Sequence, residues 1–426
     1  MSPGTVLLLG ATGFIGRHAL RALAHEGYGV VCGVRGEAPE GCRAMRVDFA
    51  RDHDEAIWLP RLAGIDYVIN AVGLMRETGG ATFEALHVAA PQALFRASAR
   101  AGVKKVVQVS ALGADARASS AYHLTKRRAD EALATLPMPW VIVQPSLVFG
   151  EEGASTALFA MLASLPLVPV PGGGAQTIQP VHVDDLAEAI VRVLATSEFD
   201  RTRIAVVGPR PLTLREYLAI LRRSMGLGAP HFVGVPMPLV RKAAAIGGKL
   251  PGSLLDRESL AMLERGNAAP ADDVTRLLGR APCAAERFVS ARAARALANQ
   301  ARLAWLLPLL RYAVALVWIV TGIVSLGVYP VNESYALLER VGLTGPAASI
   351  ALYGAALLDL AFGIGSLVMR RRAGLWRAQI ALIVGYTILI TIFLPEYWLH
   401  PYGPLTKNAP MVVAILVLLQ FERSDG

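Results

Sequence analysis

A tyrosine and a lysine lie four positions apart, at Tyr122 and Lys126. On an α-helix, residues four apart share one face, so the phenol and the ammonium should point the same way. A nearby ammonium favours the phenolate, and we therefore expect Lys126 to lower the pKa of Tyr122 towards neutrality. Such a pair can act as a general acid and base. Ser110, which lies shortly before the tyrosine, is a candidate to orient a substrate carbonyl.

The first half of the chain predicts a scaffold for these side chains. Short apolar runs alternate with segments of helical character, and the runs cover residues 5–9, 29–34, 44–47, 66–72 and 105–109. Strands that alternate with helices predict an α/β fold, with a doubly wound parallel sheet of the Rossmann type. Ligands of such sheets bind at the carboxyl ends of the strands, where Ser110 is expected.

A glycine-rich turn follows the first run, at residues 10–16, and a helix is expected directly after it. Gly10 and Gly13 permit a tight turn beside a pyrophosphate, and Gly16 lets the helix pack close to the strand. The helix N-terminus offers unpaired N–H groups and the positive end of the helix dipole to phosphates. The turn therefore predicts dinucleotide binding by Gly10, Thr12, Gly13, Phe14, Ile15 and Gly16.

The end of the second run bears on which dinucleotide is bound. NAD-selective sites usually place a carboxylate there for the ribose 2′-hydroxyl, whereas this chain has Arg35. Because a guanidinium makes strong bonds to phosphate, Arg35 favours NADP(H) over NAD(H). A solvated surface arginine is the alternative. Asp48 is a candidate for the adenine edge, and Ala71, Gly73 and Pro145 complete the expected cofactor site.

These residues together resemble the short-chain dehydrogenase/reductase superfamily. The similarity rests on the glycine-rich turn, the Asn-Ala-Val-Gly strand end, Ser110, the Tyr122–Lys126 pair and Pro-Ser-Leu-Val-Phe-Gly at residues 145–150, and it covers about residues 1–290. The chain is most similar to atypical or extended members, in the branch with the nucleotide-binding accessory subunit of respiratory complex I. The resemblance implies that Tyr122 is the catalytic acid/base, that Lys126 holds the nicotinamide ribose, and that Ser110 polarises the carbonyl.

The reductase-like part is expected to have two sections. Residues 1–150 form the NAD(P)-binding Rossmann domain, and residues 151–285 add a small substrate lobe. Asp184 or Asp185 is well placed to cap a helix. No metal site is predicted, because capping explains this acidic pair better than metal binding. His182 is expected to be structural rather than catalytic.

The last third of the chain predicts a membrane domain. The whole chain is 54% hydrophobic and has a mean hydropathy of +0.44, which is too apolar for an ordinary soluble enzyme. Runs with at most one charge cover residues 312–329, 347–369, 378–394 and 410–421. We expect an all-α bundle of four transmembrane helices over residues 312–426. A soluble helical core is the alternative.

The basic residues indicate how this domain is oriented. The net charge is +9, and arginines recur beside the apolar runs. Residues 286–311 are expected to form a basic amphipathic connector on an anionic membrane surface, or otherwise a solvated helix of the middle section. Arg370, Arg371, Arg372 and Arg377 lie between the second and third spans. By the positive-inside rule, we expect an inner (cytoplasmic) membrane protein with the Rossmann domain and both termini in the cytoplasm.

The membrane part carries a second resemblance, over about residues 305–422, to the DoxX-like membrane family. It rests on Val-Trp-Ile-Val-Thr-Gly at residues 317–322, Leu-Asp-Leu at 358–360, Tyr-Thr at 386–387 and the Pro-Glu to Gly-Pro stretch at 395–404. Some relatives are associated with quinone-linked oxidation, which implies a quinone-like substrate. Asp359 lies in the middle of a span, where a carboxylate must be neutral, paired or functional. A helix-to-helix hydrogen bond is the alternative.

The leading hypothesis is a membrane-bound, NADP(H)-dependent oxidoreductase. Its substrate would be a carbonyl or alcohol on a lipophilic or quinone-like small molecule. One alternative is a non-catalytic NADP(H)-binding structural or redox-sensing module that acts through a membrane-protein partner. Another is an NAD-dependent epimerase or dehydratase. No zinc-finger spacing or RNA-recognition motif occurs in the sequence, so membrane lipid rather than nucleic acid is the expected partner of the basic residues.

Overall fold

The computed structural model describes residues 3–77, 79–247 and 256–422. The chain divides into two compact units, an N-terminal unit of residues 1–301 and a C-terminal unit of residues 302–426. We describe each unit separately.

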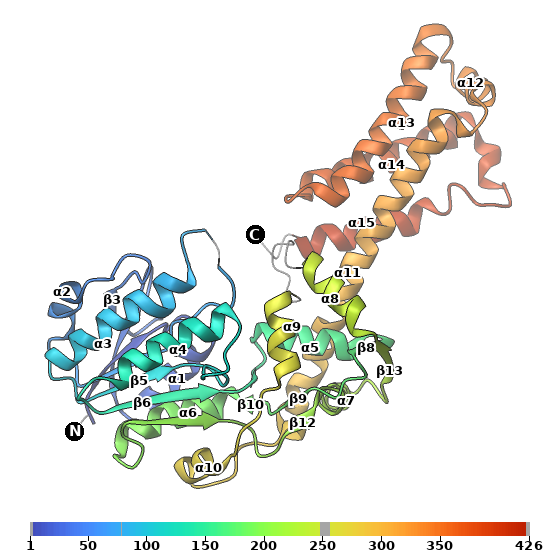
Figure 1. The fold of residues 1–426 in the computed structure, drawn as a ribbon. Helices are drawn as coiled ribbons and strands as arrows, with labels where there is room; N and C mark the ends of the chain where they lie inside the picture. Colours follow the sequence, from blue (N-terminus) through green and yellow to red (C-terminus); the bar gives the residue numbers. More distant parts are fainter. Residues whose placement is uncertain (1–2, 78, 248–255, 423–426) are drawn as a thin grey trace. The chain divides into compact units, whose positions relative to one another are not determined.

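A parallel sheet lies at the centre of the N-terminal unit (Figure 1). Within the described residues it has seven strands in the order β11-β6-β5-β4-β1-β2-β3, and every neighbouring pair is parallel. The strands are β1 (Thr5–Leu9), β2 (Gly29–Val34), β3 (Arg43–Arg46), β4 (Tyr67–Asn70), β5 (Lys105–Val109), β6 (Trp140–Pro145) and β11 (Thr202–Val206). The predicted doubly wound sheet is confirmed. The run at residues 66–72 is longer than its strand, because the chain leaves the sheet after Asn70 to form the ligand-side edge.

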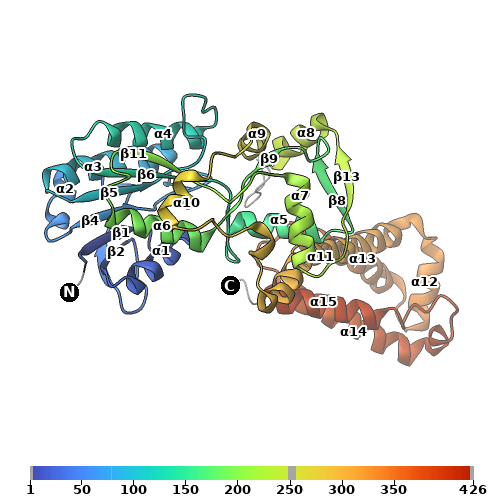
Figure 2. The ribbon, with the colours of Figure 1, turned by 90° about the horizontal axis from the view of Figure 1, so that it is seen from below.

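Helices cover both faces of this sheet (Figure 2). One layer consists of α1 (Phe14–His25), α6 (Val183–Ala195) and α10 (Asp272–Leu278). The other consists of α2 (Glu55–Trp58), α3 (Ala90–Arg100) and α4 (Ala121–Ala134), with a π-helical turn at Glu84–Ala89. Each helix buries one apolar side: Ala19 and Leu23 of α1 are both fully buried. Helix α4 carries both Tyr122 and Lys126.

The second lobe of the N-terminal unit includes residues 154–178, 212–247 and 256–265, and residues 283–301 pack on its core. Its elements are α5 (Ala154–Ser164), β8 (Leu167–Pro171), β9 (Thr177–Ile178), β12 (Leu212–Thr213), α7 (Leu214–Ser224), β13 (His231–Val235), α8 (Met237–Gly247) and α9 (Arg257–Arg265). Strand β8 pairs with β13, and β9 pairs with β12. The short strands β7 (Val148–Phe149) and β10 (Val181–His182) pair with each other where the chain passes between the sheet and the lobe.

The N-terminus of α6 differs from the prediction. His182 is the N-cap residue, and its Nδ1 accepts a hydrogen bond from the backbone N–H of Asp184 at 3.2 Å. The prediction that Asp184 or Asp185 caps this helix is wrong, because the helix begins at Val183 and places both carboxylates in its first turn. There they still face the positive end of the helix dipole. His182 has the structural role that was predicted.

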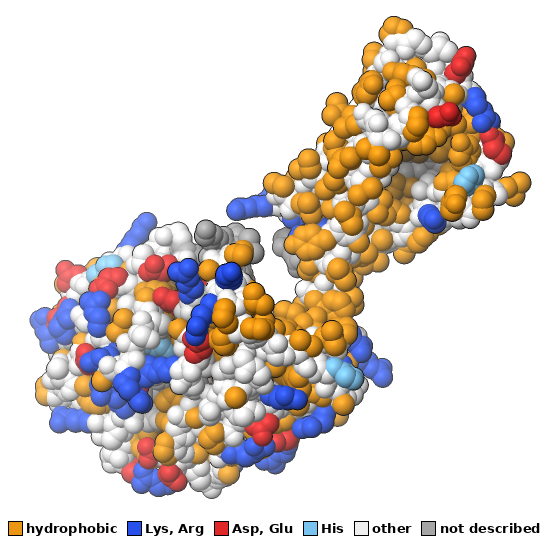
Figure 3. All heavy atoms as spheres, turned by 45° about the vertical axis from the view of Figure 1, so that its right-hand side comes forward, with side chains coloured by type: hydrophobic (Ala, Val, Ile, Leu, Met, Phe, Trp, Pro, Cys, Tyr) orange, Lys and Arg blue, Asp and Glu red, His pale blue; other side chains and the backbone are white. Residues whose placement is uncertain are grey.

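The C-terminal unit is helical, and hydrophobic side chains cover most of the surface seen in Figure 3. Its elements are the greater part of α11 (Ala291–Ile323), a π-helical turn (Val324–Val328), α12 (Val331–Arg340), α13 (Gly345–Val368), α14 (Ala373–Phe393), a 3-10 turn (Pro395–Trp398) and α15 (Asn408–Glu422). In the described part of the chain, three helical segments are long and apolar enough to cross a membrane: Ala291–Val328, Gly345–Val368 and Ala373–Phe393. The predicted fourth span corresponds to α15, which is described over 15 residues and is not one of these three segments.

The predicted connector over residues 286–311 is not a separate element. Helix α11 begins at Ala291 and continues to Ile323, through Pro308. Leu297, Ala298 and Ala301 are only 3–5% exposed, because this side of the helix packs into the core of the second lobe. The arrangement corresponds to the alternative of a helix that belongs to the middle section.

Polar side chains lie inside the C-terminal unit. Trp318 Nε1 donates to Gln379 Oε1 at 3.0 Å, and Gln379 Nε2 donates to Ser366 Oγ at 2.9 Å. Asp359 of α13 is buried, and its Oδ1 has no hydrogen-bond partner among the described residues. Gln379 of α14 therefore joins α11 to α13 by hydrogen bonds, and this carboxylate oxygen of Asp359 takes no part in them.

Candidate functional site

The glycine-rich turn joins β1 to α1 and leaves no room for side chains. A Cβ on Gly16 would lie 1.9 Å from the carbonyl oxygen of Gly10, and a Cβ on Gly10 would lie 2.8 Å from the carbonyl oxygen of Ala71. Gly10 also has a φ of +81°, which favours glycine. Helix α1 begins here without a side-chain cap. Its first N–H groups are thus available to a phosphate, as a dinucleotide pyrophosphate requires.

The other predicted residues of the turn have distinct positions. Thr12 and Gly13 are exposed at the start of α1. Ile15 packs against the hydrophobic core, and the ring of Phe14 lies so close to Gly150 that a Cβ there would meet it at 2.6 Å. The side chains of Phe14 and Ile15 therefore fix the helix, and their contact with a cofactor stays a prediction.

Arg35 and Asp48 lie at the carboxyl edge of the sheet, after β2 and β3. Arg35 is exposed and has no hydrogen bond or ion pair among the described residues, so its guanidinium is free for a ligand. Asp48 is half-buried, and its Oδ1 accepts a hydrogen bond from the N–H of Ala50 at 3.0 Å. Asp48 thus shapes the turn after β3, and its contact with adenine stays a prediction.

Ala71 and Pro145 lie at the same carboxyl edge of the sheet, at the ends of β4 and β6. The N–H of Ala71 donates to the carbonyl of Leu9 at 3.0 Å, which continues the pairing of β4 with β1 beyond its last residue. Pro145 ends β6, and its carbonyl accepts a hydrogen bond from Leu112 at 2.9 Å. Both residues therefore line the edge where a dinucleotide of this fold binds.

Lys126 lies under the ends of two central strands. Its Nζ donates to the carbonyl oxygens of Val109 at 2.9 Å and Val72 at 3.2 Å, and a Cβ on Gly73 would lie 3.3 Å from it. The side chain is 3% exposed, and this burial lowers the pKa of Lys126 to about 8, with Asp130 opposing the shift. The ammonium is therefore fixed at the carboxyl ends of β4 and β5, one helical turn from Tyr122.

Tyr122 is half-buried in a cluster of rings. Its ring lies 5.5 Å from that of His87, 6.3 Å from Phe83 and 5.3 Å from His123, measured between centroids. Burial, followed by the charge of Asp130, raises the pKa of Tyr122 to about 12. The expectation that this pKa is lowered towards neutrality is wrong for this arrangement, because burial desolvates the phenolate and the charge of Asp130 adds to the shift. Near neutral pH Tyr122 is a proton donor.

Ser110 is buried, and its hydroxyl is already engaged. The Oγ atom donates to Asp130 Oδ2 at 2.5 Å, and Ser110 is 3% exposed. Burial raises the pKa of Asp130 to about 7, and Ser110, Lys126 and Arg203 offset the shift only in part. In this arrangement the serine hydroxyl donates to the carboxylate, and no hydrogen bond joins Ser110 to Tyr122 among the described residues. The role of Ser110 toward a substrate carbonyl stays a prediction.

This buried carboxyl leads to a prediction about stability. Asp130→Asn is expected to gain thermal stability relative to wild type as the pH rises from about 4 to about 7. The pKa of about 7 in the folded protein lies above the ordinary value of 3.8. The free energy of unfolding of the wild type is therefore highest below pH 3.8 and falls as the pH rises towards 7, because the carboxyl ionises more readily in the unfolded chain. Thermal unfolding of the detergent-solubilised protein across this range measures the difference. Glu131→Gln, at the next and exposed position, is the control; a difference that does not vary with pH would refute the account.

His87 is a residue of this site that the sequence did not indicate. It is 1% exposed, its Nε2 accepts a hydrogen bond from the N–H of Leu74 at 3.1 Å, and its Nδ1 lies 3.1 Å from Thr125 Oγ1. Burial and then Lys126 lower the pKa of His87 to about 3, so the ring is neutral. His87 therefore joins the loop after β4 to helix α4 and supports the ring of Tyr122. A lone histidine carries no motif by which it could have been found.

A cavity of about 490 Å³ lies beside the tyrosine cluster. Its walls come from the segment after β4, and from α8 and the start of α9; the lining residues are Met75, Arg76, Glu77, Phe83, Ala244, Ala245, Asp256, Arg257 and Glu258. Phe83 belongs both to this lining and to the ring cluster of Tyr122. The cavity is therefore a candidate substrate site between the sheet and the second lobe.

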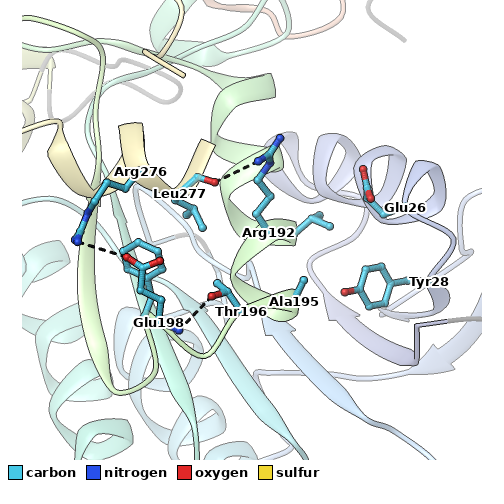
Figure 4. Close-up of a pocket in the computed structure, with 10 residues that line it drawn as sticks. Glu26, Tyr28, Arg192, Ala195, Thr196, Glu198, Arg276 and Leu277 are labelled. Atoms are coloured by element: carbon cyan, nitrogen blue, oxygen red, sulfur yellow. Dashed lines mark hydrogen bonds and ion pairs between the residues drawn. The ribbon is translucent and has the colours of Figure 1, made fainter. Parts of the chain in front are cut away.

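A second cavity, of about 380 Å³, lies among the amino end of β2 and the ends of α1, α6 and α10 (Figure 4). Its charged residues are engaged: Arg192 donates to the carbonyl of Leu277 at 3.4 Å, and Arg276 pairs with Glu198 at 3.4 Å. Because ligands of doubly wound sheets bind at the carboxyl ends of the strands, this cavity is not the active site. In the described part of the chain, His, Cys, Asp and Glu form no cluster that could hold a metal ion.

Comparison with known protein families gives two matches along the chain. Residues 6–208 match the NAD dependent epimerase/dehydratase family, and residues 315–416 match the DoxX-like family. The first match contains the glycine-rich turn, Tyr122 and Lys126. The second contains most of the described helices of the C-terminal unit.

Two curated proteins show what the N-terminal unit is similar to. Over 250 residues the chain is 31% identical to NADH dehydrogenase [ubiquinone] 1 alpha subcomplex subunit 9 of Arabidopsis thaliana, covering 56% of this chain and 62% of that protein. Over 247 residues it is 28% identical to ceramide reductase of Caulobacter vibrioides, covering 57% of this chain and 77% of that protein. The chain spans only 62–65% of the length of the complex I subunits that it matches first.

Solved structures agree with the fold. A nucleoside-diphosphate-sugar epimerase from Staphylococcus aureus superposes with a TM-score of 0.55 at 17% identity, covering 67% of this chain and 99% of that one. Residues 6–208 therefore form an NAD-dependent epimerase/dehydratase-type domain of the extended short-chain dehydrogenase/reductase kind, related to the complex I subunit, and residues 315–416 form a DoxX-like domain.

Proposed function

We propose that this protein is a membrane-attached, NADP(H)-dependent oxidoreductase that interconverts a carbonyl and an alcohol on a lipophilic small molecule. The observation that carries the proposal is the position of Lys126. Its Nζ lies at the carboxyl ends of β4 and β5, against Gly73, where the nicotinamide end of a dinucleotide lies in this fold. Tyr122 is on the same helix one turn earlier, in contact with a ring that lines the cavity.

The residues divide the chemistry among them. NADPH, when bound, supplies the hydride for the carbonyl carbon. Tyr122 donates its phenolic proton to the carbonyl oxygen, so that the carbonyl becomes an alcohol and the tyrosine becomes a phenolate. The ammonium of Lys126, which is buried and lies one helical turn away on the same helix, would favour that phenolate electrostatically. In the reverse direction the phenolate accepts the proton of the alcohol.

The substrate class rests on two supports. The cavity beside Tyr122 has apolar walls at Met75, Phe83, Ala244 and Ala245, and its other five lining residues are charged. The relative named ceramide reductase points to a lipid carbonyl, and a DoxX-like domain is compatible with a quinone-like molecule. We propose an apolar molecule that is dissolved in the bilayer.

The choice of NADP(H) leads to a prediction about Arg35. Arg35→Ala is expected to weaken NADPH binding about tenfold or more and to leave NADH binding unchanged, because a charge-assisted hydrogen bond contributes about 1.5–3 kcal/mol. Nucleotide fluorescence in titrations of the detergent-solubilised protein measures both affinities. Arg43→Ala is the matched control, since Arg43 is an equally exposed arginine at the amino end of β3. Equal losses for both nucleotides would contradict the assignment.

The orientation in the membrane follows from the charged ends of the C-terminal unit. Arg372 Nη1 donates to Glu422 Oε1 at 3.0 Å, and this bond joins the α13–α14 loop, with Arg370 and Arg371, to the end of α15. At the other end of the unit, Arg340 pairs with Glu396. We propose that the arginine-rich end faces the cytoplasm at the inner membrane. The N-terminal unit then lies on the same side, because two crossings separate it from the α13–α14 loop.

A second candidate function is a non-catalytic NADP(H)-binding module of a membrane complex. The engagement of Ser110 with Asp130 favours it, because the site then lacks the predicted carbonyl donor. The similarity to a complex I subunit fits the same idea. Single-turnover oxidation of bound NADPH, in nanodiscs that contain lipophilic ketones and quinones, separates the candidates. Oxidation supports the oxidoreductase, and persistent NADPH supports the module.

A further inference from the structure

Helix α8 of the second lobe (Met237–Gly247) presents an apolar stripe to its surroundings. Leu239 is 56% exposed, Ile246 is 65% exposed, and Ala243 between them is also exposed. Residues at i, i+4 and i+7 lie along one side of a helix, so the three form a continuous stripe. The β8–β13 ribbon that precedes the helix adds Leu167 and Val233, which are 62% and 43% exposed.

Such exposure is concentrated in this region. Within the described part of the N-terminal unit, the only other exposed large apolar side chains are Met75 and Leu124, which lie close to the tyrosine cluster. Soluble proteins seldom gather exposed apolar side chains in one place unless the surface binds something. The stripe of α8 therefore marks an interaction surface.

The charges around the stripe indicate its partner. Lys242 is exposed and forms no hydrogen bond or ion pair with any described residue, and Arg241 pairs with Glu264 at 2.9 Å. Helix α8 itself contains no acidic residue. Apolar side chains flanked by basic ones are typical of helices that lie in the interface of an anionic membrane.

The second lobe is joined directly to a helix that is long and apolar enough to cross a membrane. Helix α11 begins in the core of the lobe, through Leu297, Ala298 and Ala301, and continues directly into the first segment that is long enough to cross a bilayer. We infer that the stripe of α8 rests in the interfacial region of that bilayer. The proposed partner of the stripe is a lipid surface, and the experiment below distinguishes it from a second copy of the chain.

The opposite side of α8 connects this surface to the candidate substrate site. Ala244 is fully buried, and with Ala245 it lines the cavity of about 490 Å³ that also contains Met75 and Phe83. One helix thus separates the cavity from the proposed lipid surface. An apolar substrate would then pass from the bilayer beside α8 towards Tyr122, a consequence that rests on the proposed function.

Quenching by spin-labelled lipid tests the lipid contact directly. The full chain, with its three cysteines replaced by alanine, is labelled with a fluorophore at Leu239→Cys or Ile246→Cys and placed in nanodiscs of phosphatidylcholine and phosphatidylglycerol. Quenching by doxyl-labelled lipid should be several-fold stronger than at Ala24→Cys, an exposed position on α1. Equal quenching at the three positions would overturn the inference. Energy transfer between labelled chains, without lipid quenching, would assign the stripe to a second copy and overturn it as well.

Two further measurements keep this result separate from the proposed function. Only labelled proteins that bind NADPH like the wild type are compared, and the quenching itself needs no turnover, so a protein without hydride transfer can still show the lipid contact. Hydrogen exchange of residues 237–247 in the unmodified chain gives a test without substitutions. Exchange should be slower in anionic nanodiscs than in an amphipathic polymer, and equal rates would count against the inference.

Discussion

Replacing Tyr122 with phenylalanine is expected to lower kcat by about two to four orders of magnitude, which is the usual contribution of a positioned general acid. The substitution removes only the hydroxyl. The ring contacts with Phe83, His87 and His123 remain, so the fold and NADPH binding should be unchanged. Because burial raises the pKa of Tyr122 to about 12, the wild-type hydroxyl is protonated at neutral pH and can donate. Steady-state turnover and nucleotide binding, measured on the same preparation, separate the two effects.

Tyr67→Phe is the control for this prediction. Tyr67 is a half-buried tyrosine at the amino end of β4, in ring contact with Tyr28, and it lies away from the ligand edge of the sheet. It should keep full turnover. Unchanged turnover in Tyr122→Phe would remove the acid/base role, and a loss of NADPH binding in that variant would show that the ring has moved.

Gly16→Ala is expected to abolish nucleotide binding and to destabilise the N-terminal unit. The new Cβ would lie 1.9 Å from the carbonyl oxygen of Gly10, a backbone atom that cannot rotate away. Either α1 moves off β1 or the turn opens, and both changes displace the N–H groups that face the pyrophosphate. Overpacking of this kind costs about 1–3 kcal/mol, and more where only backbone can yield. Thermal unfolding and NADPH titration measure the two losses.

Gly36→Ala is the matched control, because Gly36 lies just after β2, does not have a positive φ, and has no atom within 4 Å of the place that a Cβ would take. The affinity and unfolding temperature of this variant should stay near those of the wild type. Normal NADPH binding by Gly16→Ala would show that the close approach of α1 to β1 is not what forms the site.

The sequence predicted the elements that have strong local signals. Strands β1, β2 and β5 are short, largely apolar segments that are mostly buried, and the glycine-rich turn has a motif of its own. The start of the first span was predicted less well, because α11 begins inside the second lobe. Hydropathy identifies an apolar helix. It does not show whether neighbouring protein or lipid covers that helix.

The sequence predicted which residues form the site, but not their burial or their hydrogen-bond partners. The pairing of Tyr122 with Lys126 follows from helix periodicity, and α4 carries both. The partner of Ser110 could not be read in the same way, because Asp130 reaches it only through the packing of α4 on the sheet. The direction of the Tyr122 pKa depends on burial, which spacing alone does not determine. His87 lies in a different segment from Ser110 and Tyr122, in the π-helical turn before α3, and it belongs to no motif.

The most direct test follows a labelled hydride. The full-length protein in nanodiscs is incubated with NADPH that carries deuterium at the reactive carbon and with lipophilic ketones and quinones, and products are analysed by mass spectrometry. We expect deuterium on the new alcohol carbon of a ketone, or oxidised NADPH with a reduced quinone, in the wild type and not in Tyr122→Phe. NADPH that binds to the wild type but keeps its deuterium with every acceptor would contradict the oxidoreductase account and leave a binding module.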